Sequence, residues 1–330
     1  MSGRETSTSE LAREKRKSAA PTAAAATPTP TATATAAAAT PTPTPTATAT
    51  QDPNPARAPL RILHPDGHID PALDPELSEG ELLSLHRHML LLRVMDERML
   101  GMQRQGRIGF YGACSGQEAA VIGSGAALLP QDWVFPALRE GGVMLQRGYS
   151  LKPYLAQIFG NVLDPTKGRQ MPSHMADRSV NQVSWSSCIG SQLPQAAGAA
   201  WAAKLRGDAA VVVGYMGDGA TSSADFHYAM NFSAVFKLPI VLFCQNNGWA
   251  ISVPTKEQTA AKTLAHKALE YGLRGHRVDG NDVLAVFSVM KSAVERARRG
   301  EGPSFIEAVT YRLGAHSSSD DPTRYRDENE

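Results

Sequence analysis

The residues best suited to chemistry stand in two short polar segments, each directly after an apolar stretch. The first is Gly217-Asp218-Gly219-Ala220, and the second is Gln245-Asn246-Asn247-Gly248-Trp249. Glycines let backbone approach an anion, and the helix expected after the first segment would present free N–H groups, so this turn suits a phosphate. Asp218 would repel a phosphate unless a divalent cation lay between the two groups, so its presence indicates a metal.

The spacing of the two segments strengthens that interpretation. They lie about 30 residues apart, which is the length of one strand–helix–strand crossover. If the two strands are neighbours in a parallel sheet, their carboxyl ends bring Asp218 and Asn247 to the same edge. A carboxylate, an amide oxygen, a backbone carbonyl, phosphate oxygens and water would complete the octahedral oxygen shell of Mg²⁺. A Gly-Asp-Gly turn alone is more often structural, so the metal site depends on this spacing.

The rest of the chain predicts the framework around these segments. Ser78-x-x-Glu81 is a capping-box pattern with apolar residues following at helical spacing, which predicts a helix over 78–105. Strands are expected at 209–215, 239–244 and 304–310, and helices at 116–129, 194–206, 223–236, 257–272 and 282–299. Continuous apolar strands that alternate with helices indicate an α/β fold with a doubly wound, mostly parallel sheet and helices on both faces.

Composition excludes several classes of protein. The 330 residues carry 33 Lys and Arg against 32 Asp and Glu, so no strong field would recruit nucleic acid or an anionic membrane. Polar residues interrupt every apolar stretch before the roughly 20 residues that a membrane span needs. Cys114, Cys188 and Cys244 form no C-x-x-C pair, which predicts neither a zinc site nor a disulfide framework. Cys114 and Cys244 are expected to be small buried apolar residues.

The first 59 residues differ from the remainder. This Ala/Thr/Pro-rich segment has almost no apolar side chain to bury, so we expect a disordered tail at 1–59 and one domain at 60–330. Basic residues near the start are similar to those of a transit peptide, but such peptides avoid acids, and Glu5, Glu10 and Glu14 argue against one. We therefore expect a cytoplasmic protein, and a mitochondrial one only if the tail is a transit peptide.

The segment from Gly217 through Asn247 resembles the thiamine diphosphate-binding motif of transketolase-like and 2-oxo acid dehydrogenase enzymes. Further segments narrow the resemblance to α subunits of the heterotetrameric 2-oxo acid dehydrogenases, the decarboxylating first components of multienzyme complexes. These segments are Gln-Arg-Gln-Gly-Arg-Ile at 103–108, Gly-Arg-Gln-Met-Pro at 168–172, Gln-Leu-Pro-Gln-Ala at 192–196, Val-Asp-Gly-Asn-Asp at 278–282 and His-Ser-Ser-Ser-Asp-Asp at 316–321. The resemblance runs from about residue 80 to residue 327, and it implies the thiamine diphosphate-binding α/β fold.

The resemblance also implies a cofactor site. Thiamine diphosphate would be held through Mg²⁺ on Asp218, Asn247 and the carbonyl of Trp249. The residues matched to cofactor contacts are Arg139, Ser187, Ile189, Gly217, Asp218, Gly219, Ala220, Gln245, Asn247 and His316. The planar guanidinium of Arg139 suits this task because it binds phosphate oxygens bidentately. The family usually has Tyr in place of Leu138, and branched-chain members often have Arg in place of Gln245, so two diphosphate contacts are weakened or rerouted.

Two further features come from the same resemblance. His316 matches the family's catalytic histidine, and with a pKa near neutrality it would hydrogen-bond the reacting group and assist acyl transfer to a lipoyl group. A potassium site of the animal branched-chain enzyme matches Ser186, the Cys188 carbonyl, Ser191 and Gln192, although Cys188 replaces a proline. The alternative is a loop whose hydroxyls cap the helix that starts at Pro194.

Partners and substrate are likewise implied by the resemblance. In this family the acid that activates the cofactor belongs to the β subunit, so we expect an α₂β₂ heterotetramer, a lipoyl-bearing acyltransferase and a 2-oxo acid substrate. His-Ser-x-x-Asp-Asp at 316–321 and Arg-Gln-Met-Pro at 169–172 favour the branched-chain type, acting on 3-methyl-2-oxobutanoate and related 2-oxo acids. Pyruvate dehydrogenase is the alternative.

Two hypotheses from other functional classes were also considered. A cofactor-free scaffold subunit is suggested by Leu138, Gln245 and the end of the chain at Glu330, where relatives continue with a helical portion. That ending predicts either a fragment or a short variant with weaker assembly. A nicotinamide-binding oxidoreductase would need glycines in G-x-G-x-x-G order, whereas this chain has Gly214-x-x-Gly217-x-Gly219.

Overall fold

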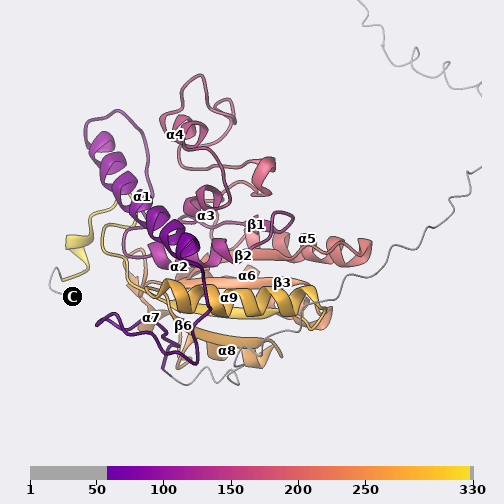
Figure 1. Ribbon diagram of the computed structural model, residues 1–330. Coiled ribbons are helices and arrows are strands. Elements are labelled where there is room, and N and C mark those ends of the chain that lie inside the picture. The colour runs from indigo at the N-terminus through magenta and orange to yellow at the C-terminus, as the bar shows by residue number, and fades with distance from the viewer. Residues whose placement is uncertain (1–57, 328–330) are drawn as a thin grey trace, which may run out of the picture. The chain divides into compact units, whose positions relative to one another are not determined.

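The computed structural model describes residues 58–327, and their centre is a five-stranded parallel sheet (Figure 1). Its strands, in spatial order, are β1 (Trp133–Phe135), β2 (Val212–Gly217), β3 (Ile240–Asn246), β7 (Ser304–Val309) and β6 (Arg274–Asp279). Gly217 is aligned with Gln245, and Gln245 with Ala308. The predicted parallel α/β class is confirmed. The expected tail at 1–59 lies outside the described residues except for its last two.

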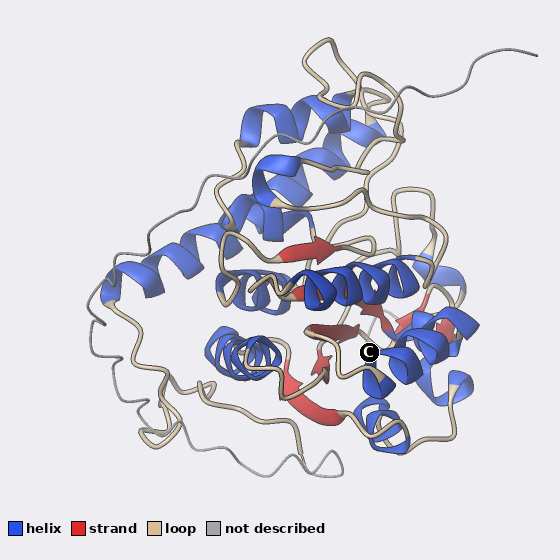
Figure 2. Cartoon of the chain, turned by 90° about the vertical axis from the view of Figure 1, so that its right-hand side faces the viewer, coloured by secondary structure: helices blue, strands red, loops and turns tan. Residues whose placement is uncertain are grey.

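Helices pack on both faces of this sheet (Figures 1 and 2). One face contacts α1 (Glu79–Arg104), α2 (Glu118–Ala126), α3 (Gly141–Gln146) and α9 (Val283–Arg298). The other face contacts α5 (Gln192–Arg206), α6 (Ala224–Val235) and α8 (Leu264–Glu270). Side chains alternate across each strand, so Val213 and Tyr215 join the first apolar cluster while Val212 and Met216 join the second.

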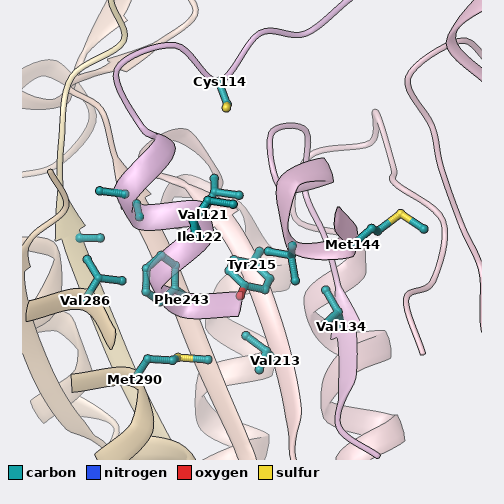
Figure 3. Packing of buried hydrophobic residues seen from close by; sticks show 14 of the residues in the cluster. Cys114, Val121, Ile122, Val134, Met144, Val213, Tyr215, Phe243, Val286 and Met290 are labelled. Carbon is teal, nitrogen blue, oxygen red and sulfur yellow. The ribbon is translucent and has the colours of Figure 1, made fainter. Parts of the chain in front are cut away.

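The first cluster is built around two aromatic rings on neighbouring strands. Figure 3 shows Tyr215 and Phe243 beside Val121 of α2 and Val286 of α9, and the two ring centroids lie 5.4 Å apart. The Tyr215 hydroxyl donates a hydrogen bond of 3.0 Å to Ser124, so the buried polar atom is satisfied. Each such fully buried side chain contributes about 1.5–3 kcal/mol relative to exposure, which makes the sheet a rigid support for its loops.

The element boundaries confirm most predictions and correct one. α1 begins at the predicted capping box, in which the Ser78 hydroxyl accepts from Glu81 N and a Glu81 carboxylate oxygen accepts from Ser78 N. The single helix predicted at 257–272 is wrong. The chain there forms α7 (Thr255–Gln258) and then α8, because Thr259 is extended and Thr263 caps α8 by accepting from His266 N at 3.1 Å.

Several short elements were not predicted from the sequence. They are β1, β6, α3, α4 (Leu151–Phe159), the hairpin of β4 (Trp249–Ala250) and β5 (Val253–Pro254), and the 3-10 helices η1 (Arg178–Val180), η2 (Asp218–Ser222) and η3 (Pro322–Arg324). The Cys114 and Cys244 side chains are buried, as expected, and Cys188 is exposed. Within residues 58–327, none of the helices combines the length and the apolar composition that a membrane span requires.

Because all five strands are parallel, their carboxyl ends meet at one edge of the sheet. Arg139 follows β1, Asp218 follows β2, Asn247 follows β3, and the segment leading to His316 follows β7. The fold therefore gathers at one edge the residues that the sequence marked as chemical.

Candidate functional site

Asp218 begins the 3-10 helix η2 directly after β2, and its side chain is 1% exposed. Its Oδ2 accepts hydrogen bonds from Thr255 Oγ1 at 3.1 Å and from Gln258 Nε2 at 2.9 Å. Burial raises the pKa of this carboxyl, whereas Gln258, Thr255 and the backbone amide of Asn247 lower it. The aligned ends of β2 and β3 place Asp218 and Asn247 at the same edge of the sheet, as the spacing of the two segments predicted.

Asn247 lies in a tight turn after β3. Its Oδ1 accepts from Trp249 N at 3.2 Å, and its Nδ2 donates to Gln117 Oε1 at 3.2 Å. Gly248 has a φ of +86°, in the left-handed region where glycine is favoured, and it turns the chain into the β4–β5 hairpin. An amide oxygen has two lone pairs, so Asn247 Oδ1 keeps one acceptor position after bonding Trp249.

The phosphate-type turn is packed closely by that hairpin. A Cβ added at Gly219 would lie 2.8 Å from the Cβ of Ala250, so only glycine fits there without a shift. The Ser223 hydroxyl caps α6 by accepting from Phe226 N at 3.3 Å. Lys267 Nζ donates to the Thr221 carbonyl at 3.2 Å, which places a cation behind the turn. The turn is therefore compact, and a positive charge lies close to it.

Arg139 and His316, which are 177 residues apart in the chain, are in direct contact. Arg139 Nη2 donates to the His316 carbonyl at 2.8 Å and lies 3.3 Å from His316 Nδ1, while Nη1 donates to the Ala113 carbonyl. Because a guanidinium only donates, Nδ1 must accept in this contact, and the ring proton of the neutral imidazole is then on Nε2. The candidate catalytic histidine is therefore oriented by the candidate diphosphate residue.

The expectation of a near-neutral pKa for His316 is wrong. Burial, followed by the nearby positive charges of Arg139 and Arg312, lowers the pKa of His316 to about 4. Both effects disfavour the protonated ring. At neutral pH this histidine is an uncharged hydrogen-bonding group, and an Nε2–H donor is the form that it offers.

Gln245 faces a buried acid that the sequence analysis missed. Its Nε2 donates to Glu140 Oε1, and Glu140 Oε2 accepts from Ala137 N at 2.8 Å and Arg139 N at 3.2 Å. Burial raises the pKa of Glu140. The sequence did show an acid next to Arg139. Because β1 was not predicted, this segment could not be assigned to the end of a strand.

The loop at 186–192 gathers the oxygens expected at a potassium site. Ser186 Oγ and Ser191 Oγ lie 3.0 Å apart, and Ser191 Oγ donates to the Cys188 carbonyl at 2.8 Å. Gln192 Nε2 donates to the Tyr215 carbonyl at 2.8 Å, which fixes the loop against β2. The helix starts at Gln192, not at Pro194, and N-cap Ser191 makes no side-chain capping bond, so the capping alternative is wrong for that residue.

Ser187 and Ile189 are exposed at the tip of this loop, and Ser187 has an unpredicted partner. Its hydroxyl lies 2.6 Å from His174 Nε2, while His174 Nδ1 lies 3.0 Å from the Pro172 carbonyl. The buried His174 ring lies near the ring of Trp185, with 6.3 Å between the two centroids. His174 follows the family-like segment at 168–172 by two residues, which was the only signal for it.

Arg312 is a second residue that the sequence analysis missed. Its side chain is 1% exposed and donates from Nη2 to the hydroxyl of Tyr325, which in turn donates to Asp320. Asp320 Oδ2 also accepts from the backbone N–H of His316 at 2.7 Å. This chain of hydrogen bonds ties the histidine loop to Arg312.

Three buried polar atoms around this edge have no hydrogen-bond partner among residues 58–327. They are Gln117 Nε2, Gln245 Oε1 and Arg312 Nη1. An unsatisfied buried polar atom costs about 1–3 kcal/mol, and a ligand bound at this edge would supply partners. Residues 58–327 include no group of three His, Cys, Asp or Glu side chains arranged for a metal ion. The expected metal site instead combines one acid with an amide and a carbonyl.

Several curated proteins are similar in sequence to this chain. The "2-oxoisovalerate dehydrogenase subunit alpha 2, mitochondrial" of Arabidopsis thaliana is 47% identical over 251 residues, which are 76% of this chain and 53% of that protein. The "2-oxoisovalerate dehydrogenase subunit alpha, mitochondrial" of Mus musculus is 45% identical over 267 residues, covering 81% of this chain and 60% of that protein. The Caenorhabditis elegans protein of the same name is 46% identical over 281 residues, covering 84% and 65%.

These names correct the expected location. Each of these relatives is named as mitochondrial, so the prediction of a cytoplasmic protein is wrong. That prediction depended on three glutamates near the start of the chain, at positions 5, 10 and 14, which lie outside the described residues. A few acidic residues were not enough to argue against a transit peptide.

A family model described as "Dehydrogenase E1 component" matches residues 86–330. The match begins inside α1 and includes every strand of the sheet and each residue of the candidate site. The chain spans between 53% and 65% of the length of the three relatives above. On this match, the chain belongs to the dehydrogenase E1 component family.

Proposed function

We propose that this chain is the α subunit of a branched-chain 2-oxo acid dehydrogenase, an oxidoreductase that uses thiamine diphosphate. The reaction is oxidative decarboxylation of 3-methyl-2-oxobutanoate and related 2-oxo acids, with transfer of the acyl group to a lipoyl group. The relatives named 2-oxoisovalerate dehydrogenase support the substrate class. The observation that carries the proposal is that the aligned ends of β2 and β3 bring Asp218 and Asn247 to one edge of the sheet, beside the Gly219 turn.

The residues at this edge fit a diphosphate held through Mg²⁺. Asp218, Asn247 and the Trp249 carbonyl would hold the ion, because hard cations prefer oxygen ligands. The diphosphate would be faced by Gly217, Gly219, Ala220, Arg139 and Gln245. The rings of the cofactor would be contacted by the backbone of Ser187 and Ile189. The partnerless Gln117 Nε2 supports this fit, because it is a buried amide donor beside Asn247 that can serve a phosphate oxygen. When bound, thiamine diphosphate supplies the electron-accepting ring that decarboxylation of a 2-oxo acid requires.

The chain's own residues would bind and orient the reacting group. Arg139 is fixed by the carbonyls of Ala113 and His316, so little of its side-chain freedom remains to be lost on binding an anion. His316 is neutral, and its Nε2–H is the donor available to an oxygen that gains negative charge. A neutral donor holds its proton at that oxygen without contributing a net charge.

We also place a K⁺ ion at the loop of Ser186, Cys188, Ser191 and Gln192. The hydroxyls of Ser186 and Ser191 and the carbonyl of Cys188 lie within hydrogen-bond distance of one another. Gln192 Oε1 is buried and has no hydrogen-bond partner among the described residues, which leaves one more oxygen for a cation. Such an ion would keep the loop that carries Ser187 and Ile189 in one conformation.

The active enzyme needs partners. We propose a single domain at 60–330 that joins a β subunit in an α₂β₂ heterotetramer and passes its acyl group to a lipoyl-bearing acyltransferase. The β subunit would supply the acid that activates the cofactor. The exposed tip at Ser187 and Ile189 supports this assembly, because cofactor rings at that tip would need cover from another chain.

The test is a decarboxylation assay of the chain assembled with its β subunit. We expect turnover of 3-methyl-2-oxobutanoate to exceed that of pyruvate, both requiring thiamine diphosphate and Mg²⁺. One methylene in an apolar pocket is worth about 1–3 kcal/mol, so a preference of roughly tenfold or more is measurable. A preference for pyruvate would contradict the substrate class. Absence of any thiamine diphosphate binding would favour the cofactor-free scaffold.

A further inference from the structure

Two side chains from one short helix hold the carboxylate of Asp218. Thr255 Oγ1 and Gln258 Nε2, both on α7, donate to the same atom, Asp218 Oδ2, at 3.1 and 2.9 Å. Two donors that converge on one oxygen fix the rotation of a carboxylate, and that rotation sets the direction in which the other oxygen presents its lone pairs. Both donors are neutral, so they orient Asp218 without cancelling its charge.

The helix that carries these donors is tied to the turn that carries the other proposed metal ligands. Thr255 N donates to the Gly248 carbonyl at 2.9 Å. Gln258 Nε2 also lies 3.2 Å from the Val253 carbonyl, which keeps its amide group facing Asp218. The stretch from Asn247 to Gln258 therefore supplies two proposed ligands of the ion and orients the third.

We propose that Gln258, with Thr255 as the weaker partner, is a positioning residue that sets the orientation of the Asp218 carboxylate for a divalent cation. This inference rests on the proposed function, because it requires Asp218 to bind a metal ion. Hydrogen-bond partners of a ligating carboxylate typically contribute about 10- to 100-fold to metal affinity. Gln258 acts through Asp218 and is not itself a ligand.

The experiment measures Mn²⁺ in place of Mg²⁺, because free Mn²⁺ is read directly by electron paramagnetic resonance. The chain assembled with its β subunit is titrated with Mn²⁺ at saturating thiamine diphosphate. Gln258→Met keeps the length of the side chain and removes its donor. Thr255→Val removes a hydroxyl that Thr255→Ser keeps. Glu257→Gln is the matched control, because Glu257 is exposed on the same helix.

We expect Gln258→Met to weaken Mn²⁺ binding by about 10-fold or more, and Thr255→Val to weaken it less. Thr255→Ser and Glu257→Gln should bind Mn²⁺ as the unmodified enzyme does. Without metal, all four variants should still unfold in a single cooperative transition, which shows that a loss of Mn²⁺ binding comes from the ligand and not from an unfolded chain.

The possible results separate this inference from the proposed function. If the unmodified enzyme retains no Mn²⁺ with thiamine diphosphate present, the proposed function fails and the inference with it. If the enzyme binds Mn²⁺ and Gln258→Met binds it equally well, the inference alone is overturned. An equal loss in Glu257→Gln also overturns it. Should Gln258→Met fail to fold, the Thr255 pair decides, and equal affinities of Thr255→Val and Thr255→Ser overturn the inference.

Discussion

The edge of the sheet has two halves that differ in charge and in how their residues meet. On one half, Asp218 and Asn247 follow the neighbouring strands β2 and β3, and neutral amide and hydroxyl groups surround the buried acid. On the other half, Arg139 and His316 follow β1 and β7, which are not neighbours, and burial, followed by the charges of Arg139 and Arg312, lowers the pKa of the histidine. A diphosphate bound with a divalent ion needs both halves, because one holds the cation and the other meets the remaining anionic charge.

The largest effect should come from the acidic half. Asp218→Asn removes the only charged protein side chain proposed as a ligand of Mg²⁺, so Mg²⁺-dependent binding of thiamine diphosphate should fall by more than the roughly 100-fold that loss of an outer partner costs. Isothermal titration of the enzyme assembled with its β subunit measures this. The metal-free variant should be no less stable than the unmodified protein, because burial of the charged carboxylate is itself unfavourable. Normal Mg²⁺-dependent binding by the variant would remove the basis of the comparison.

The second largest effect is expected from replacing His316 in the cationic half. His316→Gln should lower kcat by about 100-fold, the lower range for loss of a positioned proton donor. Because the folded pKa is about 4, below the unfolded value of about 6.5, the folded protein resists protonation of this ring. The stabilising effect of the neutral ring is full above pH 6.5 and is lost as the pH falls from 6.5 to 4. Chemical denaturation across that range should show a smaller acid loss in the variant.

His276 provides the matched control for that measurement. It lies in β6, and burial, with the charges of Arg296 and Arg274, also lowers its pKa to about 4. His276→Gln should therefore reduce the acid loss of stability in the same direction, while kcat stays unchanged. An equal loss of kcat in both variants would mean that His316 acts through the fold and not at the site.

The third prediction concerns the guanidinium of Arg139. Arg139→Lys keeps the charge and loses the planar fork that bonds the carbonyls of Ala113 and His316. We expect kcat/KM to fall by about 10-fold or more, since a hydrogen bond to a charged group is worth about 1.5–3 kcal/mol. Arg147→Lys is the control, because Arg147 bonds the carbonyls of Leu129 and Val180, outside the candidate site, and should change stability only. Equal kinetic effects would contradict a specific role.

The sequence predicted the acidic half better than the cationic half, for a physical reason. β2 and β3 are six and seven residues long and mostly buried, so their apolar runs and the spacing between them are visible in the sequence. β1 has three residues, too few for a periodic pattern, and Arg139 was assigned through resemblance alone. Glu140, His174 and Arg312 were missed because the sequence has no local pattern that marks their roles.

Local polar chemistry also explains the one wrong helix. The pattern over 257–272 is amphipathic, yet Thr263 and Gly272 interrupt it, since Thr263 caps the start of α8 and Gly272 adopts a φ of +74° just after its end. The separation leaves α7 free to place Thr255 and Gln258 against Asp218. Contacts of this kind depend on the tertiary arrangement, so the pattern of apolar residues could not predict them.

The smallest predicted effect comes from placing a positive charge at position 245, between the two halves. Gln245 stands between them, donating to Glu140 while its own Oε1 is buried without a partner among the described residues. Gln245→Arg would pair a cation with Glu140 and direct further donors toward the diphosphate. The cost of burying the new charge offsets part of the gain, so we expect thiamine diphosphate to bind only about 3- to 10-fold more tightly, less than the full 1.5–3 kcal/mol of a charged hydrogen bond. The same substitution in a Glu140→Gln background should weaken thiamine diphosphate binding or lower stability, because the buried cation then has no acid beside it. If the tighter binding of thiamine diphosphate persisted in that background, Glu140 would not pair with residue 245.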